Sequence, residues 1–432
     1  ASNSKAFTTA AIAMLVDEGK MSWDDKVRDY LPYFEISDPY VSAEMTVRDL
    51  LCHRSGLATF SGDLIWYGSN YSREDIIRRA KYLEPVSGFR SEYGYQNIMF
   101  LAAGEIVAAV SGQSWDDFVK EHFFDPLNMS TAVTSIREFT PQTNLALPHN
   151  ETNGKNHTIE WVNWDNIAPA GGICASVNEL TNWMNLQLGY GTLDSTTFWS
   201  ERQAHEMWAP QINKGIGSWS RQNFPSKTFS AYGLGWDLYN YHGRKIVNHG
   251  GGYDGMISKT VLIPEENIGF VILTNNNNWL SSALSNYMLD MLLTGATTKD
   301  WAAYYLELKQ GQDAEDAAAK KKAEEERLKD TKPTLPLEAY AGTYGGPMYG
   351  NCIVRVIGDQ LAFQFEPTPL FRGTFRHWQY DVFQLNWGTK MMLPSGTAQF
   401  IIGVDGTVEE MRIDVPNPDF DFTELKFMKF DQ

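Results

Sequence analysis

Three β-branched segments lie close together in the second half of the chain, and they restrict its fold more than any other feature. They cover residues 245–249, 256–263 and 268–274, and the last two are joined by a turn with the sequence Pro-Glu-Glu-Asn. β-Branched residues bounded by turn residues are typical of strands. We therefore expect these segments to form adjacent antiparallel strands of one sheet.

Helical patterns precede and follow this sheet. Residues 6–18 carry apolar side chains at helical spacing, which predicts an amphipathic helix, and Gly19 suits the position that follows a helix. Similar patterns predict further helices at 46–51, 97–110, 177–189 and 279–294. The first part of the chain is therefore expected to combine helices with an antiparallel sheet.

The remainder of the chain changes character twice. Residues 301–330 are rich in Ala, Lys and Glu, which fits an interaction helix or a solvated helical spacer, and the spacer is the simpler interpretation. After a Pro-containing linker, residues 337–432 contain short alternating runs with Gly and Pro at intervals of about 8–12 residues, typical of a small all-β domain. We therefore expect a domain at 1–295, a helix and linker at 296–336, and a β domain at 337–432.

Composition and charge exclude several classes of protein. The 432 residues are 43% hydrophobic and 13% aromatic, as in an ordered globular protein of two or three domains. No run of about 18 apolar residues occurs, so no membrane span is expected. The net charge of −17 repels phosphate backbones and anionic lipid headgroups, so neither nucleic acid nor membrane is expected as a partner. Cys52, Cys174 and Cys352 are far apart and odd in number, so we expect free thiols, no metal site and no cofactor.

Ser2-Asn3-Ser4-Lys5 is the only S-x-x-K sequence in the chain. Residues i and i+3 share one face of a helix, so the Lys5 amine can reach the Ser2 hydroxyl. A serine hydroxyl needs a base to become a good nucleophile, and a lysine can serve only when burial or a nearby cation lowers its pKa. An isolated match is more often a helix-capping serine followed by an exposed lysine. The interpretation therefore depends on the rest of the sequence.

Two further motifs follow in order along the chain. One is Tyr95-Gln96-Asn97, and the other is His249-Gly250-Gly251 at the end of a predicted strand. This order resembles that of the serine β-lactamase and penicillin-binding protein superfamily, in particular its class C-like branch, which also holds D-aminopeptidases, DD-peptidases and esterases. The resemblance covers residues 1 to about 295 and includes the segments 50–57, 169–172, 232–236 and 273–275.

The resemblance implies a catalytic set near the start of the chain. Ser2 would attack a carbonyl carbon and form an acyl-enzyme. Lys5 and Tyr95 would carry protons to and from Ser2, and which of them is the base stays open. Asn97 would hydrogen-bond Lys5 or the amide of the substrate.

The resemblance also implies a substrate-binding strand. His249 would donate a hydrogen bond to a substrate carboxylate or to a tyrosine oxygen, and Gly250 and Gly251 would let the strand pass close to substrate. The backbone N–H groups of Ser2 and Gly252 would form the oxyanion hole. Many relatives carry lysine in place of His249, so we expect esters and small amides to be better substrates than β-lactams. Because histidine titrates at about pH 6.5, we also expect carboxylate substrates to bind more strongly as the pH falls.

The fold implied by the resemblance is α/β (α+β), with an antiparallel sheet flanked by helices, an all-helical lobe and a small lipocalin-like β-barrel after them. Family members carry a helix and two strands before the nucleophile helix, so we expect a missing or separate N-terminal segment to complete the sheet. The expected partner is a small-molecule or peptide substrate, with a homo-oligomer left open, and the expected location is periplasmic or secreted.

Two alternatives to a hydrolase of peptides, D-amino-acid derivatives or esters stay open. One is a β-lactamase or penicillin-binding sensor with slow turnover, which the deacylation rate would distinguish. The other is a binding protein with a vestigial site, against which the intact set of Ser2, Lys5, Tyr95 and Asn97 argues.

Overall fold

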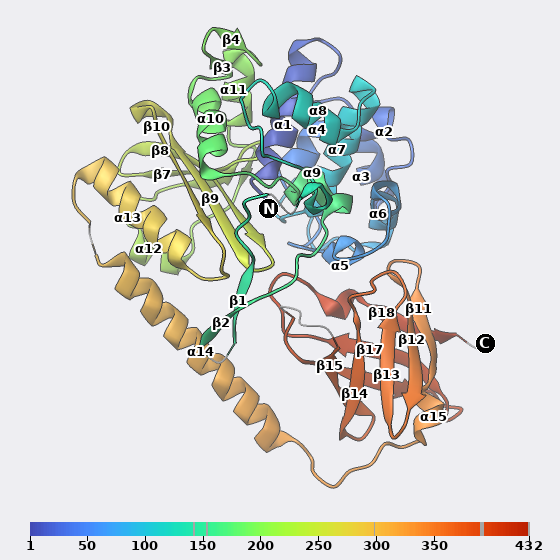
Figure 1. Ribbon diagram of the computed structural model, residues 1–432. Coiled ribbons are helices and arrows are strands. Elements are labelled where there is room, and N and C mark those ends of the chain that lie inside the picture. The colour runs from blue at the N-terminus through green and yellow to red at the C-terminus, as the bar shows by residue number, and fades with distance from the viewer. Residues whose placement is uncertain (141–142, 153, 298, 389–392, 431–432) are drawn as a thin grey trace. The chain divides into compact units, whose positions relative to one another are not determined.

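The computed structural model describes residues 1–140, 143–152, 154–297, 299–388 and 393–430, and the chain divides into two compact units (Figure 1). The first unit comprises Ala1–Thr59 and Glu84–Leu306. The second comprises Phe60–Leu83 and Glu307–Gln432. Residues 60–83, expected from sequence to belong to the first domain, therefore make most of their contacts with the C-terminal part of the chain.

A six-stranded antiparallel sheet lies in the first unit, in the order β10-β9-β8-β7-β6-β5. The predicted strands are confirmed as its last three, and they pair in sequence order as expected. Asn267 ends the turn between β9 and β10 with a φ of 52°, a conformation that asparagine tolerates better than most residues. The strands are β5 (Ile212–Asn213), β6 (Ser230–Tyr232), β7 (Asp237–Tyr241), β8 (Arg244–Tyr253), β9 (Met256–Ile263) and β10 (Ile268–Thr274).

Helices cover the two sides of this sheet. Figure 1 shows α13 (Leu280–Thr294) along one side, where Leu289 packs in a buried cluster with Ile246 and Val261. Other helices are grouped on the opposite side, and they position the residues of the S-x-x-K and Y-x-N motifs. These helices are α1 (Ser4–Asp17), α4 (Val47–Leu51), α7 (Asn97–Ser111), α9 (Ala168–Gly171) and α10 (Val177–Leu188).

Helix α1 is buried on every side through its first ten residues, so the expected amphipathic helix is wrong in this respect. Phe7 stacks on Trp183 of α10 with ring centroids 3.7 Å apart. The hydroxyl groups of Thr8 and Thr9 donate to the carbonyl oxygens of Pro169 and Lys5, at 2.6 and 3.0 Å. The helix can be buried all round because its small polar side chains find carbonyl partners.

Helix α7 is apolar and Ala-rich as predicted, and it ends at Gly112, whose φ of 77° favours glycine. In the described part of the chain no single helix has the length and apolar character needed to cross a membrane. Among the described residues, the helices Asn97–Ser111 and Trp115–Phe124 have the required length and apolar character only when they are taken together, and the chain bends by 80° between them.

The second unit contains a closed barrel of eight antiparallel strands, which confirms the expected all-β domain. Phe363 and Phe375 stack inside it at 4.7 Å, and Phe400 meets Phe375 edge to face at 5.9 Å. Aromatic packing of this kind fills a small barrel with a solid core. The strands are β11 (Gly342–Gly346), β12 (Gly350–Ile357), β13 (Gln360–Phe365), β14 (Arg372–Gln379), β15 (Val382–Trp387), β16 (Gly396–Ile402), β17 (Val408–Asp414) and β18 (Lys426–Phe430).

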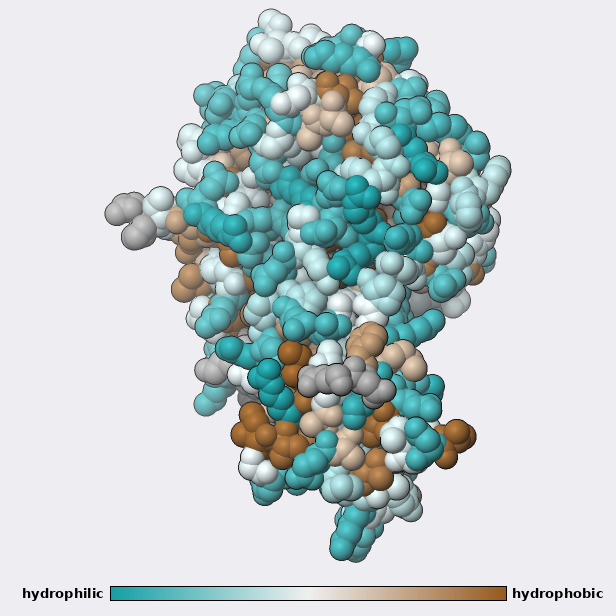
Figure 2. Space-filling view, turned by 90° about the vertical axis from the view of Figure 1, so that its right-hand side faces the viewer, coloured by the Kyte–Doolittle hydropathy of each residue, from teal (hydrophilic) through white to brown (hydrophobic). Residues whose placement is uncertain are grey.

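The charge-rich stretch forms α14 (Trp301–Glu326), of which Trp301 alone is buried among its 26 described residues. Lys309 lies one turn before Asp313 with an ion pair of 2.6 Å, an arrangement that supports exposed helices. The helix is exposed to solvent from Gln310 to Glu326, as in a solvated spacer, whereas in its first part Trp301 is buried and Tyr305 accepts a hydrogen bond from Asn286. On the face shown in Figure 2 most surface is hydrophilic, in keeping with a net charge of −17.

Within the second unit, the carboxylate of Glu424 joins the 60–83 segment to the barrel. It accepts hydrogen bonds from the Ser61 hydroxyl, from the backbone N–H of Gly62 at 2.9 Å and from the Tyr349 hydroxyl at 3.0 Å. The Tyr67 ring also packs against Phe420 at 4.4 Å. A segment far away in sequence is thereby built into the C-terminal unit.

We expect Glu424→Ala to lower the free energy of unfolding of the second unit by about 1–3 kcal/mol, the range for hydrogen bonds to a charged group. Urea denaturation followed by tryptophan fluorescence would measure the change. Glu409→Ala removes an exposed glutamate of β17 and serves as the control, with little expected change. Equal stability of the two variants would contradict a joining role for Glu424.

Candidate active site

The side chain of Lys5 is fully buried at the centre of the site. Its Nζ lies 3.0 Å from Ser2 Oγ, 2.7 Å from Asn97 Oδ1 and 2.9 Å from the carbonyl oxygen of Ala170. The structure therefore brings Ser2, Lys5 and Asn97 together as the sequence predicted. It adds the Ala170 carbonyl, which sequence analysis noted only as part of a family segment.

These three partners of Lys5 are electrically neutral, and two of them can only accept hydrogen bonds. Asn97 Oδ1 and the Ala170 carbonyl oxygen would take the two hydrogens of a neutral amine, which leaves the nitrogen lone pair for the Ser2 O–H. An ammonium group would instead donate to all three oxygens. The arrangement can therefore hold the lysine in either state and can move a proton between Ser2 and Lys5.

Ser2 is held where α1 begins. The Ser4 hydroxyl donates to the carbonyl oxygen of Ala1 at 2.8 Å and accepts from the backbone N–H of Ile173 at 3.0 Å. Asn3 donates from Nδ2 to the Ser258 hydroxyl at 2.8 Å. The positive end of a helix dipole also favours negative charge at this position. The two residues between Ser2 and Lys5 thus fix the position of Ser2, a role that the motif alone did not indicate.

Strand β8 passes beside Ser2 at Gly251. A Cβ atom at this position would lie 2.9 Å from the Ser2 backbone nitrogen and 2.4 Å from Ser258 Oγ, so a larger residue would collide with the nucleophile segment. A Cβ on Gly250 or Gly252 would meet nothing closer than 3.9 Å. The close approach expected of the glycine run therefore falls on Gly251.

Tyr95 lies beside the lysine, with its ring centroid 4.7 Å from Lys5 Nζ. His53 packs against the Tyr95 ring at 4.1 Å, and its Nδ1 accepts from the backbone N–H of Gln96 at 2.9 Å. Burial lowers the pKa of His53 well below its usual value, so the ring stays neutral and can accept this hydrogen bond. His53, with a φ of 61°, is thus a positioning residue for Tyr95.

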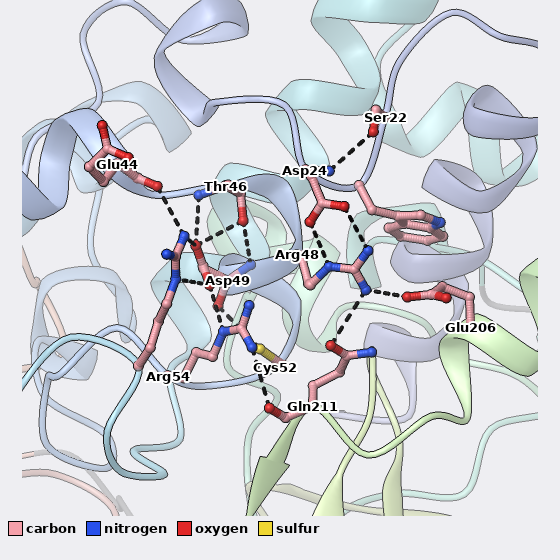
Figure 3. A network of polar contacts seen from close by, with 12 residues as sticks. Ser22, Asp24, Glu44, Thr46, Arg48, Asp49, Cys52, Arg54, Glu206 and Gln211 are labelled. Atoms are coloured by element: carbon pink, nitrogen blue, oxygen red, sulfur yellow. Dashed lines mark hydrogen bonds and ion pairs between the residues drawn. The ribbon is translucent and has the colours of Figure 1, made fainter.

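A buried carboxylate anchors the two loops on which His53 and Tyr95 lie (Figure 3). Asp49 is fully buried, and its oxygens accept from Arg54 at 2.6 Å and from Arg90 at 2.7 and 3.0 Å. Burial acts to raise the pKa of Asp49, but the hydrogen bonds from Arg90 and Thr46 outweigh it and hold this pKa below 3.8. Asp49 therefore ties the 53–54 turn to the loop that leads to Tyr95.

His249 is buried, and both of its ring nitrogens are engaged. Nδ1 lies 2.6 Å from the Gly250 carbonyl oxygen, which can only accept, so this nitrogen carries the proton. Nε2 lies 2.8 Å from the Tyr232 hydroxyl and accepts from it. The sequence predicted a donor aimed at substrate or at a tyrosine oxygen. The structure instead gives an acceptor fixed by Tyr232.

The expectation that His249 titrates near pH 6.5 also needs correction. Burial, with repulsion from Lys5, lowers the pKa of His249 to about 3. The imidazole is therefore neutral throughout the range in which the enzyme would be assayed. Carboxylate binding cannot strengthen through protonation of His249 between pH 5.5 and 8.

We expect Asp49→Asn to lower the free energy of unfolding by about 2–4 kcal/mol at pH 7, because it breaks a buried ion pair. The pKa of Asp49 is lowered in the folded protein, so its contribution is present above about pH 3.8 and is lost as the pH falls below that value. Urea denaturation from pH 7 to pH 3 would show the difference from wild type shrinking. Asp24→Asn removes an exposed partner of Arg48 and should cost below about 1 kcal/mol.

We expect wild type and His249→Gln to have kcat/KM profiles of the same shape between pH 5.5 and 8, whatever their absolute rates. A step at about pH 6.5 that disappears in the variant would show that His249 titrates normally. By linkage, the neutral buried ring also stabilises the fold above about pH 6.5 and loses that contribution as the pH falls toward 3.

Comparisons with known proteins agree with this geometry. The family model described as Beta-lactamase matches residues 1–295, and a domain of unknown function, DUF3471, matches residues 326–429. "Unguisins hydrolase ungD'" of Aspergillus campestris is 27% identical over 94% of this chain and 78% of its own length. Penicillin-binding protein 4 of Amycolatopsis lactamdurans is 25% identical over 63% of this chain and 70% of its own length.

Solved structures share the fold at lower identity. An octameric penicillin-binding protein homologue from Pyrococcus abyssi superposes with a TM-score of 0.61 at 20% identity, over 99% of this chain and 87% of that one. A D-stereospecific amidohydrolase from Streptomyces superposes with a TM-score of 0.56 at 19% identity, over 69% of this chain and 86% of that one. Because the family model spans well over half of the residues, the chain belongs to the β-lactamase family of serine hydrolases.

Proposed function

We propose that this enzyme forms an acyl-enzyme on Ser2 and cleaves amide or ester bonds of small peptides, D-amino-acid derivatives or esters. The observation that carries the proposal is the contact of 3.0 Å between Lys5 Nζ and Ser2 Oγ. Geometry of this kind is what an activated serine nucleophile needs.

Acylation would begin with attack of Ser2 Oγ on the carbonyl carbon, while its proton moves to the Lys5 amine. The tetrahedral oxyanion would be held by the backbone N–H groups of Ser2 and Gly252, where one donor is worth about 2.7–4 kcal/mol. Collapse then breaks the bond to the amine or alcohol, which leaves with the proton that Lys5 or Tyr95 returns. Asn97 and the Ala170 carbonyl would keep the lysine aimed at Ser2 throughout.

Deacylation would repeat the same proton path with water as the nucleophile. The water attacks the ester carbonyl and gives its proton to the Lys5–Tyr95 pair, and Ser2 Oγ receives a proton as the acid product leaves. Tyr95 lies beside Lys5, and its hydroxyl group would be the second member of this relay. Nothing in this cycle requires His249 to change its protonation.

Amides and esters fit this site better than β-lactams do. Every β-lactam carries a carboxylate, and at position 249 it would meet a neutral ring with both nitrogens engaged rather than a cation. The names of a D-stereospecific amidohydrolase and a D-amino acid amidase with the same fold favour D-amino-acid amides as the first substrates to try. A cavity of about 1010 Å³ beside Asn3 and Ser4, with Trp161 and Trp164 in its lining, offers apolar surface for a side chain.

The proposed N-terminal segment that completes the sheet stays a prediction. Strand β10 pairs with β9 on one side and, among the described residues, has no strand on its other side. Helix α13 exposes Leu280, Leu284 and Met291, which follow one another at helical spacing. These are the edge and the apolar face that such a segment would cover.

A substrate panel tests the function directly. Wild type and Ser2→Ala would be assayed on D- and L-amino-acid p-nitroanilides, short-chain p-nitrophenyl esters and nitrocefin. We expect turnover of D-anilides or esters that Ser2→Ala abolishes, and little turnover of nitrocefin. A penicillin adduct on Ser2 that persists without turnover of any substrate would favour the penicillin-binding sensor. A fluorophosphonate adduct on another residue would exclude Ser2 as the nucleophile.

We expect Lys5→Ala and Tyr95→Phe each to lower kcat by about 10²–10⁴-fold, the usual range for general acid–base groups. The double variant should lose far less than the product of the two single losses, because both residues serve one proton path. Pre-steady-state ester hydrolysis would measure acylation and deacylation separately. Multiplicative losses would show two independent roles.

A further inference from the structure

A second, smaller cavity lies on the face of the sheet opposite Ser2. Side chains alternate along a strand, so His249 faces the active site while its neighbour Asn248 faces the other way. Asn248 lines a cavity of about 210 Å³ together with residues of β7, β9, α12 (Ser218–Asn223) and α13. Its polar lining also includes Lys227, Asp237, Lys259, Ser282, Ser285 and Asn286.

This cavity has an excess of positive charge. Lys227 and Lys259 line it, and Lys214 stands beside it in an ion pair of 2.7 Å with Asp237. Three lysines therefore share one carboxylate. In the described part of the chain neither Lys227 nor Lys259 lies within ion-pair distance of an acidic group.

The partners that these two lysines do have are neutral. Lys259 Nζ donates to Asn248 Oδ1 at 2.9 Å, and Lys227 Nζ lies over the Tyr239 ring at 4.2 Å. Burial lowers the pKa of both lysines, because a desolvated ammonium group lacks the stabilisation that water gives. The carboxylate of Asp237 attracts both amines, but it is already paired with Lys214, so a further anion would compensate the remaining positive charge.

We propose that this cavity binds a small oxyanion, a carboxylate or a phosphate, between the amines of Lys227 and Lys259. A water molecule takes about 30 Å³ of liquid volume, so the cavity has room for a group of about seven non-hydrogen atoms. Hydroxyl and amide groups of Ser282, Ser285 and Asn286 line the same space and can donate further hydrogen bonds. Because the chain as a whole carries a net charge of −17, a local cluster of three lysines is an unusual feature of this molecule.

Strand β8 links this site to the active site. Asn248 is held by the Lys259 amine on one side, and its own Nδ2 donates to the Asp237 carbonyl oxygen at 3.1 Å. Lys259 is also the cross-strand partner of Gly250, next to the glycine that touches Ser2. An anion that draws Lys259 away from Asn248 therefore acts on the segment that holds His249 and Gly251. The site is independent of the substrate proposed above.

Isothermal titration calorimetry of the full chain with inorganic phosphate, and separately with acetate, tests the proposal. We expect saturable binding of at least one of them with a millimolar or lower Kd, and the comparison distinguishes a phosphate from a carboxylate ligand. Lys259→Met and Lys227→Met should each weaken binding about tenfold or more, the loss of one charged hydrogen bond. Lys120→Met removes an exposed lysine and should leave the Kd unchanged.

Thermal unfolding separates a binding role from a purely structural one. Phosphate or acetate should raise the Tm of wild type, and the increase should follow the logarithm of the anion concentration once that concentration exceeds the Kd. Without added anion, Lys259→Met should have the same Tm as wild type or a higher one, because it removes a partly buried amine from a group of three lysines that share one carboxylate, and added anion should no longer raise it. An unchanged Kd in both lysine variants, or no saturable binding of either anion to wild type, would overturn the proposal.

Discussion

The buried amine of Lys5 is the interaction on which the catalytic unit depends. A fully buried amine costs several kcal/mol, of the order of 2–7, unless each of its hydrogens finds an acceptor. Those acceptors come from Ser2 at the start of α1, from Asn97 at the start of α7 and from Ala170 in α9. The three helices must therefore meet at one point, and the requirement that places Lys5 also places Ser2.

A second layer holds Tyr95, whose ring lies beside this lysine. Asp49 binds Arg54 and Arg90, and these arginines lie in the two loops that carry His53 and Tyr95. The buried carboxylate is stable only with both arginines in place. Asp49 and its two arginines carry charge in this outer layer, whereas the hydrogen-bond partners of Lys5 at Ser2, Asn97 and Ala170 are neutral.

Local sequence patterns predicted the parts of this structure that depend on local chemistry. The S-x-x-K spacing placed Lys5 against Ser2, and the β-branched runs located β8, β9 and β10 within a few residues. Contacts made across the fold left no such signal: the Ala170 carbonyl, the packing of His53 and the transfer of residues 60–83 to the barrel unit all depend on tertiary structure. Burial likewise determines the protonation and the hydrogen bonds of His249. A motif gives the residue type at a position but not its hydrogen-bond partners or its pKa.

Strand β8 explains why His249 can be neutral and still belong to the site. Its ring is fixed on one face by Tyr232, and the next residue toward the N-terminus, Asn248, is fixed on the other face by Lys259. Side chains locked on both faces hold the backbone between them, and that backbone leads directly to Gly251 beside the Ser2 nitrogen. The strand can thus position an oxyanion hole through its main chain alone. A histidine at this position therefore contributes geometry, where a lysine would contribute charge.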